Sequence, residues 1–125
     1  MPDQRFDISY AAWVRPLLTV LGAGPAFSSV VVGEHEVRVR MGWAFRAEFP
    51  RTAISGGAAD TRAVLGWGVH GWGGRWLVNG SASGVVAVRL DPAQPARVLG
   101  VVPVRLRELR VSLTDPDAFL RAIDQ

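Results

Sequence analysis

The sequence predicts a mainly β fold: a small, partly open barrel, or two bent antiparallel sheets, with a C-terminal α-helix capping one end. Three observations lead to this prediction. Short runs in which apolar and polar residues alternate recur along the chain. Gly, Pro and Asn-Gly turn signals separate these runs. One well-marked helix start comes near the end, at residues 114–117. The length of 125 residues suits a single domain, 1–125, with a core of its own.

The N-terminal part, residues 1–27, is expected to be an extension of the barrel, or a first strand followed by a short helix. Alternation over residues 6–10 fits a strand with one buried face. Residues 13–21 fit either a strand or a helix, because Pro16 suits the first turn of a helix. The shared apolar face of that helix would hold Trp13, Leu17, Val20 and Leu21.

Residues 28–50 are predicted to form three strands. The runs 28–32 and 36–41 make a hairpin around a turn at 33–35. After Gly42 the run 43–49 continues, with its alternate residues, from Trp43 to Phe49, on one face. Pro50 either closes that strand or marks it as an edge strand. Residues 51–62 are polar and contain glycines, so a loop is expected there.

The segment Gly66–Trp76 holds five Gly and three Trp within eleven residues. That mixture is poor helix material and too aromatic for a free linker, so it predicts a tight hairpin. Asn79-Gly80 predicts a second hairpin turn. A strand over 85–90 and a loop over 91–95 follow. In the last strand region, 98–113, the alternation slips between Leu106 and Leu109, which predicts a bulge or a short turn.

The C-terminal helix is predicted over residues 115–124. Asp115 is suited to the N-cap, Pro116 to the first helical position, and Asp117 to the positive end of the helix dipole. The stripe that would plug an open barrel end consists of Phe119, Leu120 and Ile123.

Composition excludes several classes of function. The absence of Cys excludes disulfides, Cys-ligated zinc and thiol catalysis. All 14 basic residues are Arg and stand against 11 acidic residues. They divide evenly between the two halves of the chain, so nucleic-acid binding is not indicated. No apolar run approaches the roughly 20 residues of a transmembrane helix, and no basic signal region opens the chain. A cytoplasmic location is expected, with a peripheral position at a membrane as the alternative.

No catalytic, cofactor-binding or metal-binding motif is found, so we expect a non-enzyme without cofactor or metal. His70 has no acidic neighbour in the sequence to make a general-base pair. The serines lie outside Gly-x-Ser-x-Gly, and the two His lack HExxH spacing. The glycines at 68, 71 and 73 are not followed by a helix, and without Lys a Walker motif is impossible.

Two sets of residues are candidates for binding. Trp76 is expected in the core, whereas Trp72 fits both a buried and an exposed place. The candidate interaction residues of the hairpin are Trp67, His70, Trp72 and Arg75. The candidate anion-binding residues, which point outward at strand spacing, are Arg38, Arg40, Arg105 and Arg107. They would form one cationic stripe if their two strands lie close together, and otherwise an ordinary solvated face.

The C-terminal segment 106–123 resembles the ending of bacterial pleckstrin-homology (PH)-like domains. In those domains a final strand runs into a Ser-x-x-Asp-Pro helix start, as at residues 112–116 here. The segments 39–50 and 68–80 resemble a family of actinobacterial proteins with no established activity. The resemblance covers the chain from about Val30 onward and supplies no functional residues. It implies a PH-like barrel that works through an edge strand, the helix or the loops, and bacterial domains of this kind can form rings.

Three functional hypotheses follow. The first is a non-enzymatic PH-like binding or assembly module that meets a protein partner, or itself, through the hairpin 66–76. The alternative is a peripheral binder of an anionic ligand, such as a phosphate group or anionic lipid headgroups, through the Arg stripe. The third is an enzyme or small-molecule barrel with His70 at its mouth.

Overall fold

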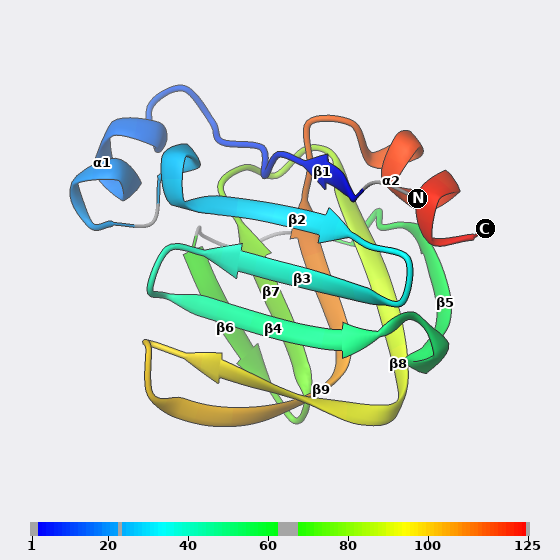
Figure 1. The fold of residues 1–125 in the computed structure, drawn as a ribbon. Coiled ribbons are helices and arrows are strands. Elements are labelled where there is room, and N and C mark those ends of the chain that lie inside the picture. The colour runs from blue at the N-terminus through cyan, green and yellow to red at the C-terminus, as the bar shows by residue number, and fades with distance from the viewer. Residues whose placement is uncertain (1–2, 23, 63–67, 125) are drawn as a thin grey trace.

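The computed structural model describes residues 3–22, 24–62 and 68–124. It is mainly β with a C-terminal helix, as the sequence predicts (Figure 1). The strands are β1 (Gln4–Phe6), β2 (Ser28–Val32), β3 (Glu36–Met41), β4 (Phe45–Pro50), β5 (Ile54–Ala59), β6 (Gly68–Trp72), β7 (Arg75–Asn79), β8 (Val85–Val98) and β9 (Val102–Ser112). The helices are α1 (Arg15–Val20) and α2 (Pro116–Ile123), with short 3-10 turns at Pro25–Phe27 and Arg51–Ala53.

The strands form one sheet of nine that is not closed, in the order β1-β2-β3-β4-β8-β9-β7-β6, with β5 also paired to β8. The long strand β8 pairs with β5 along its first half and with β4 along its second half. The sheet therefore folds over itself, with β2, β3 and β4 in front of β6, β7 and β9 (Figure 1). The pair β7–β9 is parallel, so the prediction of purely antiparallel sheets is wrong there. The reason is that β9 lies between β7 and β8, whose chains run in opposite directions.

The core fills the space between the two layers. The predicted alternation of β3 and β4 is confirmed from Val37 to Met41 and from Phe45 to Phe49, where every second residue is buried. Helix α2 begins as predicted, because the Asp115 carboxylate accepts a hydrogen bond from the Ala118 N–H at 3.1 Å. Phe119 is buried and meets Phe6 edge to face, with ring centroids 5.5 Å apart.

The N-terminal segment ties the two layers together. Strand β1 ends at Phe6, and beyond it Ile8 and Tyr10 make single bridges to Leu113 and Gly80. A Cβ at Gly80 would collide with the Tyr10 ring, so this glycine is needed for packing. The predicted Asn79-Gly80 hairpin is therefore wrong: the chain leaves β7 here without pairing β7 to β8.

The predicted loop over residues 51–62 is also wrong, because it contains β5. Two glycines of this strand make room for other side chains. A Cβ at Gly56 would collide with the Arg89 guanidinium, and one at Gly57 would lie 2.9 Å from the Ile123 methyl of α2. The glycines that make this segment look like a loop are needed because other side chains pack closely over the strand.

Strand β8 runs through the predicted loop 91–95. Its pairing with β9 shifts register between Arg89 and Gln94, which bends both strands at the junction of the two layers. Across that shift on β9 lie Leu106 and Leu109, which are both buried. The irregularity predicted between these two leucines is thus confirmed.

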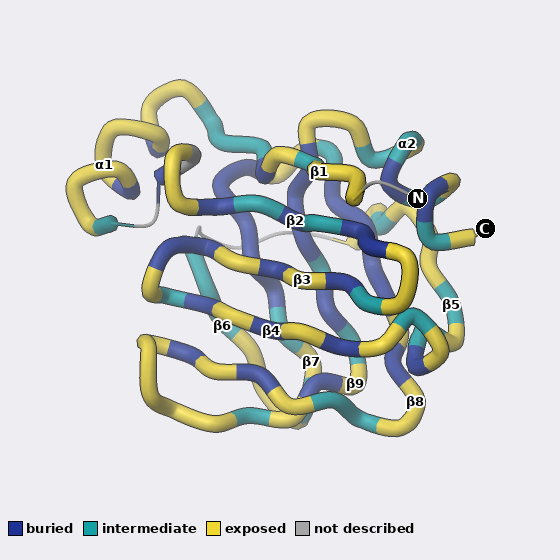
Figure 2. The backbone as a smooth tube through the Cα atoms, in the orientation of Figure 1, coloured by how far each residue is buried: buried dark blue, intermediate teal, exposed yellow. Residues whose placement is uncertain are grey.

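Helix α1 confirms the helical alternative for residues 13–21 but not its buried face. Val14 and Leu18 point into the core, four residues apart. The predicted face of Trp13, Leu17, Val20 and Leu21 is exposed (Figure 2). Trp43 is exposed as well, because Gly42 (φ 52°) turns the chain before β4 begins and removes Trp43 from the buried row.

Candidate functional site

The hairpin predicted from the Gly/Trp segment is confirmed as β6 and β7. Its turn is Gly73-Gly74, with φ of 61° and 85°, the left-handed backbone that a tight type I′ hairpin requires. Register places Trp72 opposite Arg75 and His70 opposite Leu77. Among the described strands β6 pairs with β7 alone, so it lies at the edge of the sheet. Trp67 lies outside the described residues.

Trp72 stands out on this hairpin because 89% of its surface is exposed. Trp76 has the opposite orientation and packs against the core, as the sequence analysis expects. The hairpin thus has one aromatic side chain that anchors it and one that projects from the turn. Two open cavities, of about 360 Å³ and about 390 Å³, lie against the hairpin and share Trp72 and Arg75.

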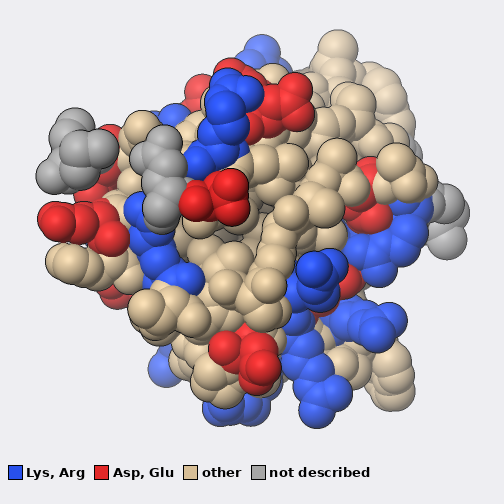
Figure 3. Space-filling model, turned by 90° about the vertical axis from the view of Figure 1, so that its right-hand side faces the viewer, with Lys and Arg blue, Asp and Glu red and all other residues tan. Residues whose placement is uncertain are grey.

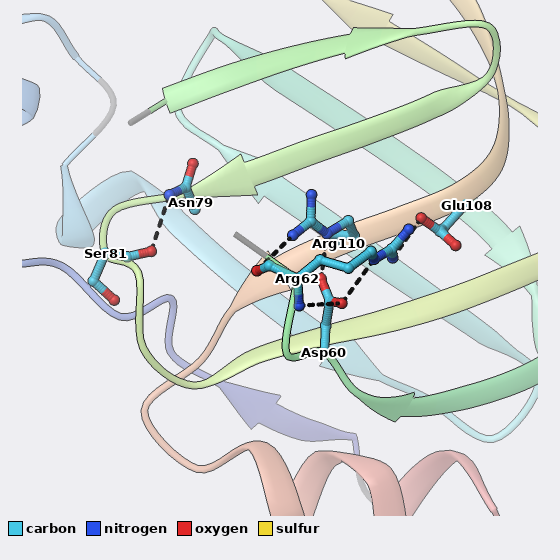
Figure 4. Close-up of polar contacts among 6 residues, drawn as sticks. All are labelled: Asp60, Arg62, Asn79, Ser81, Glu108 and Arg110. Carbon is cyan, nitrogen blue, oxygen red and sulfur yellow. Dashed lines mark hydrogen bonds and ion pairs between the residues drawn. The ribbon is translucent and has the colours of Figure 1, made fainter. Parts of the chain in front are cut away.

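An ion-pair network lies beside the hairpin, between β5 and β9 (Figure 4). Asp60, whose side chain is 5% exposed, accepts hydrogen bonds from Arg62 Nε at 2.8 Å and from Arg110 Nε. Arg62 Nη2 donates to Glu108 Oε1 at 2.7 Å. Burial raises the pKa of Asp60, but hydrogen bonds from the two arginines outweigh burial, so the pKa is lowered overall. The Asp60 carboxylate is therefore ionised and held in place at neutral pH.

Glu108 joins the network to the hairpin. Register places it opposite Arg75 on β7 and Arg89 on β8. Sequence reasoning missed this arrangement, although alternation of Glu108 and Arg110 on a strand was visible. What the sequence does not reveal is that Asp60 and Arg110, fifty positions apart, become neighbours.

His70 lines the first cavity, together with Trp72 and Arg75, so the structure brings three of the four candidate interaction residues together. Burial lowers the pKa of His70, the Asn79 side chain raises it, and the charge of Arg110 lowers it further, with a net lowering. Its Nε2 has no hydrogen bond of normal geometry within the described part of the chain.

Among the described residues, no carboxylate is hydrogen-bonded to the His70 imidazole. Glu108 is the carboxylate that lines the same cavity, and it accepts a hydrogen bond from Arg62 rather than from the imidazole. A general base needs an orienting partner and a positioned substrate. Across the ranges 3–22, 24–62 and 68–124, no three His, Asp or Glu side chains gather into a possible metal site.

The four candidate anion-binding arginines do not form one stripe. Strands β4 and β8 lie between β3, which carries Arg38 and Arg40, and β9, which carries Arg105 and Arg107. Arg38 Nη2 bonds Asp3 Oδ2 at 2.8 Å, and Arg105 Nη2 bonds the Ala93 carbonyl at 2.9 Å. Arg107 lines the second hairpin cavity instead. The condition set for a single stripe, that the two strands lie close together, is not met.

Arg40 belongs to a different row, which runs across β3, β4 and β8. It lies directly opposite Arg46, and Arg46 lies directly opposite Arg97. All three side chains are exposed, and no ion pair to them is found among the described residues. Like charges directly opposite each other destabilise a sheet, so this Arg row is not explained by folding. Arg46 and Arg97 were missed because the sequence does not say which strands pair.

Comparison with known proteins supplies no relative for this chain, so the interpretation of the site rests on the geometry described above. None of the helices in the described ranges has the length and apolar character needed to cross a membrane. No protein-family model matches the chain, and no significant similarity was found to a curated protein or to a solved structure.

Proposed function

We propose that this protein is a non-enzymatic binding or assembly module, PH-like in architecture and cytoplasmic. Its contact surface is the Gly/Trp hairpin, and its partner is a protein: a second copy of the chain or a different one. The single observation that carries the proposal is the exposure of Trp72 beside Arg75 on a tight hairpin. Trp and Arg are the residues most enriched where binding energy concentrates in protein interfaces.

The hairpin is built to hold Trp72 in place. A Cβ at Gly71 would collide with the Trp76 ring, and one at Gly74 would lie 3.1 Å from the Arg107 side chain. The turn is thus packed from beneath while Trp72 projects from it. An indole so exposed adds little to the stability of the free chain, whereas its burial by a partner stabilises a complex.

The charges around Trp72 define what the partner presents. Arg75, Arg89 and Arg107 line the second cavity, with Glu108 as its acidic residue. This excess of positive charge favours a partner that places carboxylates around an apolar side chain. The proposed partner surface is therefore acidic and carries an aromatic or aliphatic group that stacks on the indole.

The proposal is tested by light scattering coupled to size-exclusion chromatography over a range of protein concentrations. We expect the wild type to exceed its monomer mass of 13.5 kDa as concentration rises, and Trp72→Ala to return it to a monomer. Val20→Ala, which truncates another exposed apolar side chain, is the matched control and should behave like the wild type. A wild-type monomer at every concentration would contradict self-assembly and restrict the proposal to a different protein as partner.

A further inference from the structure

One end of the molecule carries most of the large apolar side chains that the described residues expose. It is formed by α1, the start of β2, the β3–β4 turn and the β8–β9 turn, all at the left of Figures 1 and 2. The residues of this apolar end are Trp13, Leu17, Val20, Leu21, Phe27, Trp43, Leu99, Val101 and Val102. Soluble monomers rarely expose so many large apolar groups together unless the surface binds something.

Direct contacts join the segments of the apolar end into one surface. Trp43 Nε1 donates to the Leu21 carbonyl, and the indole packs against Gly22, where an added Cβ would lie 3.0 Å away. The Leu99 N–H donates to the Ala44 carbonyl at 2.9 Å, which fixes the β8–β9 turn beside Trp43. The exposed groups thus sit on a connected framework.

Leu99 is the residue least explained by folding. Its φ of 54° lies in the left-handed region, where Gly or Asn would be unstrained. Its side chain is also 55% exposed, so it gains little from burial. A strained backbone and an exposed apolar side chain at the same position point to a role outside the free fold.

The charges around the apolar end have a single sign. The segments that build it, residues 13–29, 40–46 and 97–103, contain four Arg and not one Asp or Glu. The row Arg40–Arg46–Arg97 lies directly behind the β3–β4 and β8–β9 turns. The opposite end of the molecule, which faces the viewer in Figure 3, mixes acidic and basic side chains.

The exposed apolar side chains and the surrounding positive charge together indicate what binds to the apolar end. A second copy docked face to face would bring the two Arg rows together, and their electrostatic repulsion would destabilise the dimer. A copy docked in any other way would find no second apolar cluster, because within the described ranges Trp72 is the remaining large apolar side chain that is well exposed. An anionic bilayer offers both an apolar phase and negative headgroups at matching depth.

We propose that the apolar end docks on an anionic membrane surface. Trp13, Trp43 and the aliphatic tips enter the interface, where indole rings are favoured, and Arg40, Arg46 and Arg97 contact the headgroups. The β6–β7 turn lies at the bottom of the molecule in Figure 1, away from α1, and stays free for a partner. The inference goes beyond the proposed function and does not depend on it.

The apolar part of the proposal is tested by co-sedimentation of the protein with vesicles of phosphatidylcholine, with and without phosphatidylserine. We expect wild-type binding to the anionic vesicles. Leu99→Asn should weaken it about tenfold, because a leucine no longer enters the interface. The same variant should keep or raise the thermal midpoint, since Asn tolerates the left-handed backbone. Reduced binding without reduced stability would separate docking from folding.

The electrostatic part is tested by Arg46→Gln, from the middle of the Arg row. Binding to anionic vesicles should fall about fivefold and depend less on salt. Arg121→Gln, an exposed arginine on α2, is the matched control and should bind like the wild type. Three results would overturn the proposal: no vesicle binding, equal binding to both vesicle types, or unchanged binding by Leu99→Asn and Arg46→Gln. A concentration-dependent dimer that Leu99→Asn dissociates, in the absence of vesicle binding, would overturn it in favour of a self-interface.

Discussion

At the residue scale, Asp60 best shows how the structure combines distant charges. Its carboxylate is almost fully buried, and hydrogen bonds from Arg62 and Arg110 hold its pKa below the ordinary value. A buried charge that loses its partner costs far more than an exposed ion pair gains. Asp60 therefore stabilises the position of β5 relative to β9, and through Glu108 it supports the base of the hairpin.

We predict that Asp60→Asn lowers the free energy of unfolding at neutral pH by about 3 kcal/mol. The folded pKa of Asp60 is lowered, so its stabilisation is present above the ordinary pKa of about 4 and is lost as pH falls through the folded value. The variant should therefore lose less stability than the wild type on acidification. Urea unfolding at several pH values measures both effects.

Asp7→Asn is the matched control for Asp60, because the Arg5–Asp7 pair is exposed. It should change stability little. Equal losses in the two variants would show that the Asp60 network does not stabilise the fold as described.

His70 gives a second pH-dependent prediction. Its pKa is lowered in the folded state, so the unfolded chain takes up a proton first as pH falls below about 6.5. Stability should therefore decrease as pH falls from neutral through the folded pKa. The His70→Gln variant should lose this decrease of stability with falling pH. The His35→Gln variant, changed at an exposed turn, should still show it. An imidazole NMR titration giving a pKa above 6.5 for His70 would refute the assignment.

At the element scale, glycines decide which segments form strands and which form turns. Gly73 and Gly74 turn the hairpin with positive φ, whereas Gly56, Gly57 and Gly80 make room for neighbours. In the sequence these two uses look alike. Strand β2, the alternation of β3 and β4 and the start of α2 were predicted correctly because their signals are local.

The elements that could not be predicted depend on contacts distant in sequence. Strand β5 looks like a loop until Arg89 and Ile123 are seen over its glycines. Helix α1 has apolar residues on two sides, and only the fold decides that Leu18 is buried and Leu17 exposed. For the candidate site, the hairpin and Trp72 were predicted, but the Asp60 network was not, since it requires knowledge of strand pairing.

Gly80→Ala tests the docking of the N-terminal segment on β7. The added methyl group collides with Tyr10, so we predict a loss of about 2 kcal/mol or more in stability. Gly73→Asn is the contrasting variant, because its surroundings are open and Asn tolerates its φ of 61°. Thermal unfolding of the two variants decides the matter: similar midpoints would contradict the packing role of Gly80.

Asp115→Ala tests the start of α2. Loss of the hydrogen bond to the Ala118 N–H should cost about 1 kcal/mol and lower the thermal midpoint by about 4 °C. Asp124→Ala, at the C-terminal end of the same helix, should be neutral or slightly stabilising, because a negative charge is unfavourable there. The reverse order of the two midpoints would contradict the capping role.

At the scale of the whole molecule, the acidic residues are segregated from the exposed apolar surface. Counted by halves of the chain, Arg and acidic residues are balanced. In space the segments around the apolar end contain Arg alone, whereas all 11 acidic residues lie in other segments. The proposed hairpin contact and the proposed membrane contact occupy different surfaces, so a membrane-docked molecule would still present Trp72 to a partner.

The central claim is that Trp72 makes the protein contact. The most direct measurement is the ¹⁹F NMR spectrum of the chain labelled with 5-fluorotryptophan, recorded from micromolar to millimolar protein concentration, with the Trp72 signal assigned by Trp72→Phe. The account predicts that the Trp72 signal shifts or broadens as the protein associates, while the signals of Trp13 and Trp43 stay in place. Association with an unchanged Trp72 signal would contradict it.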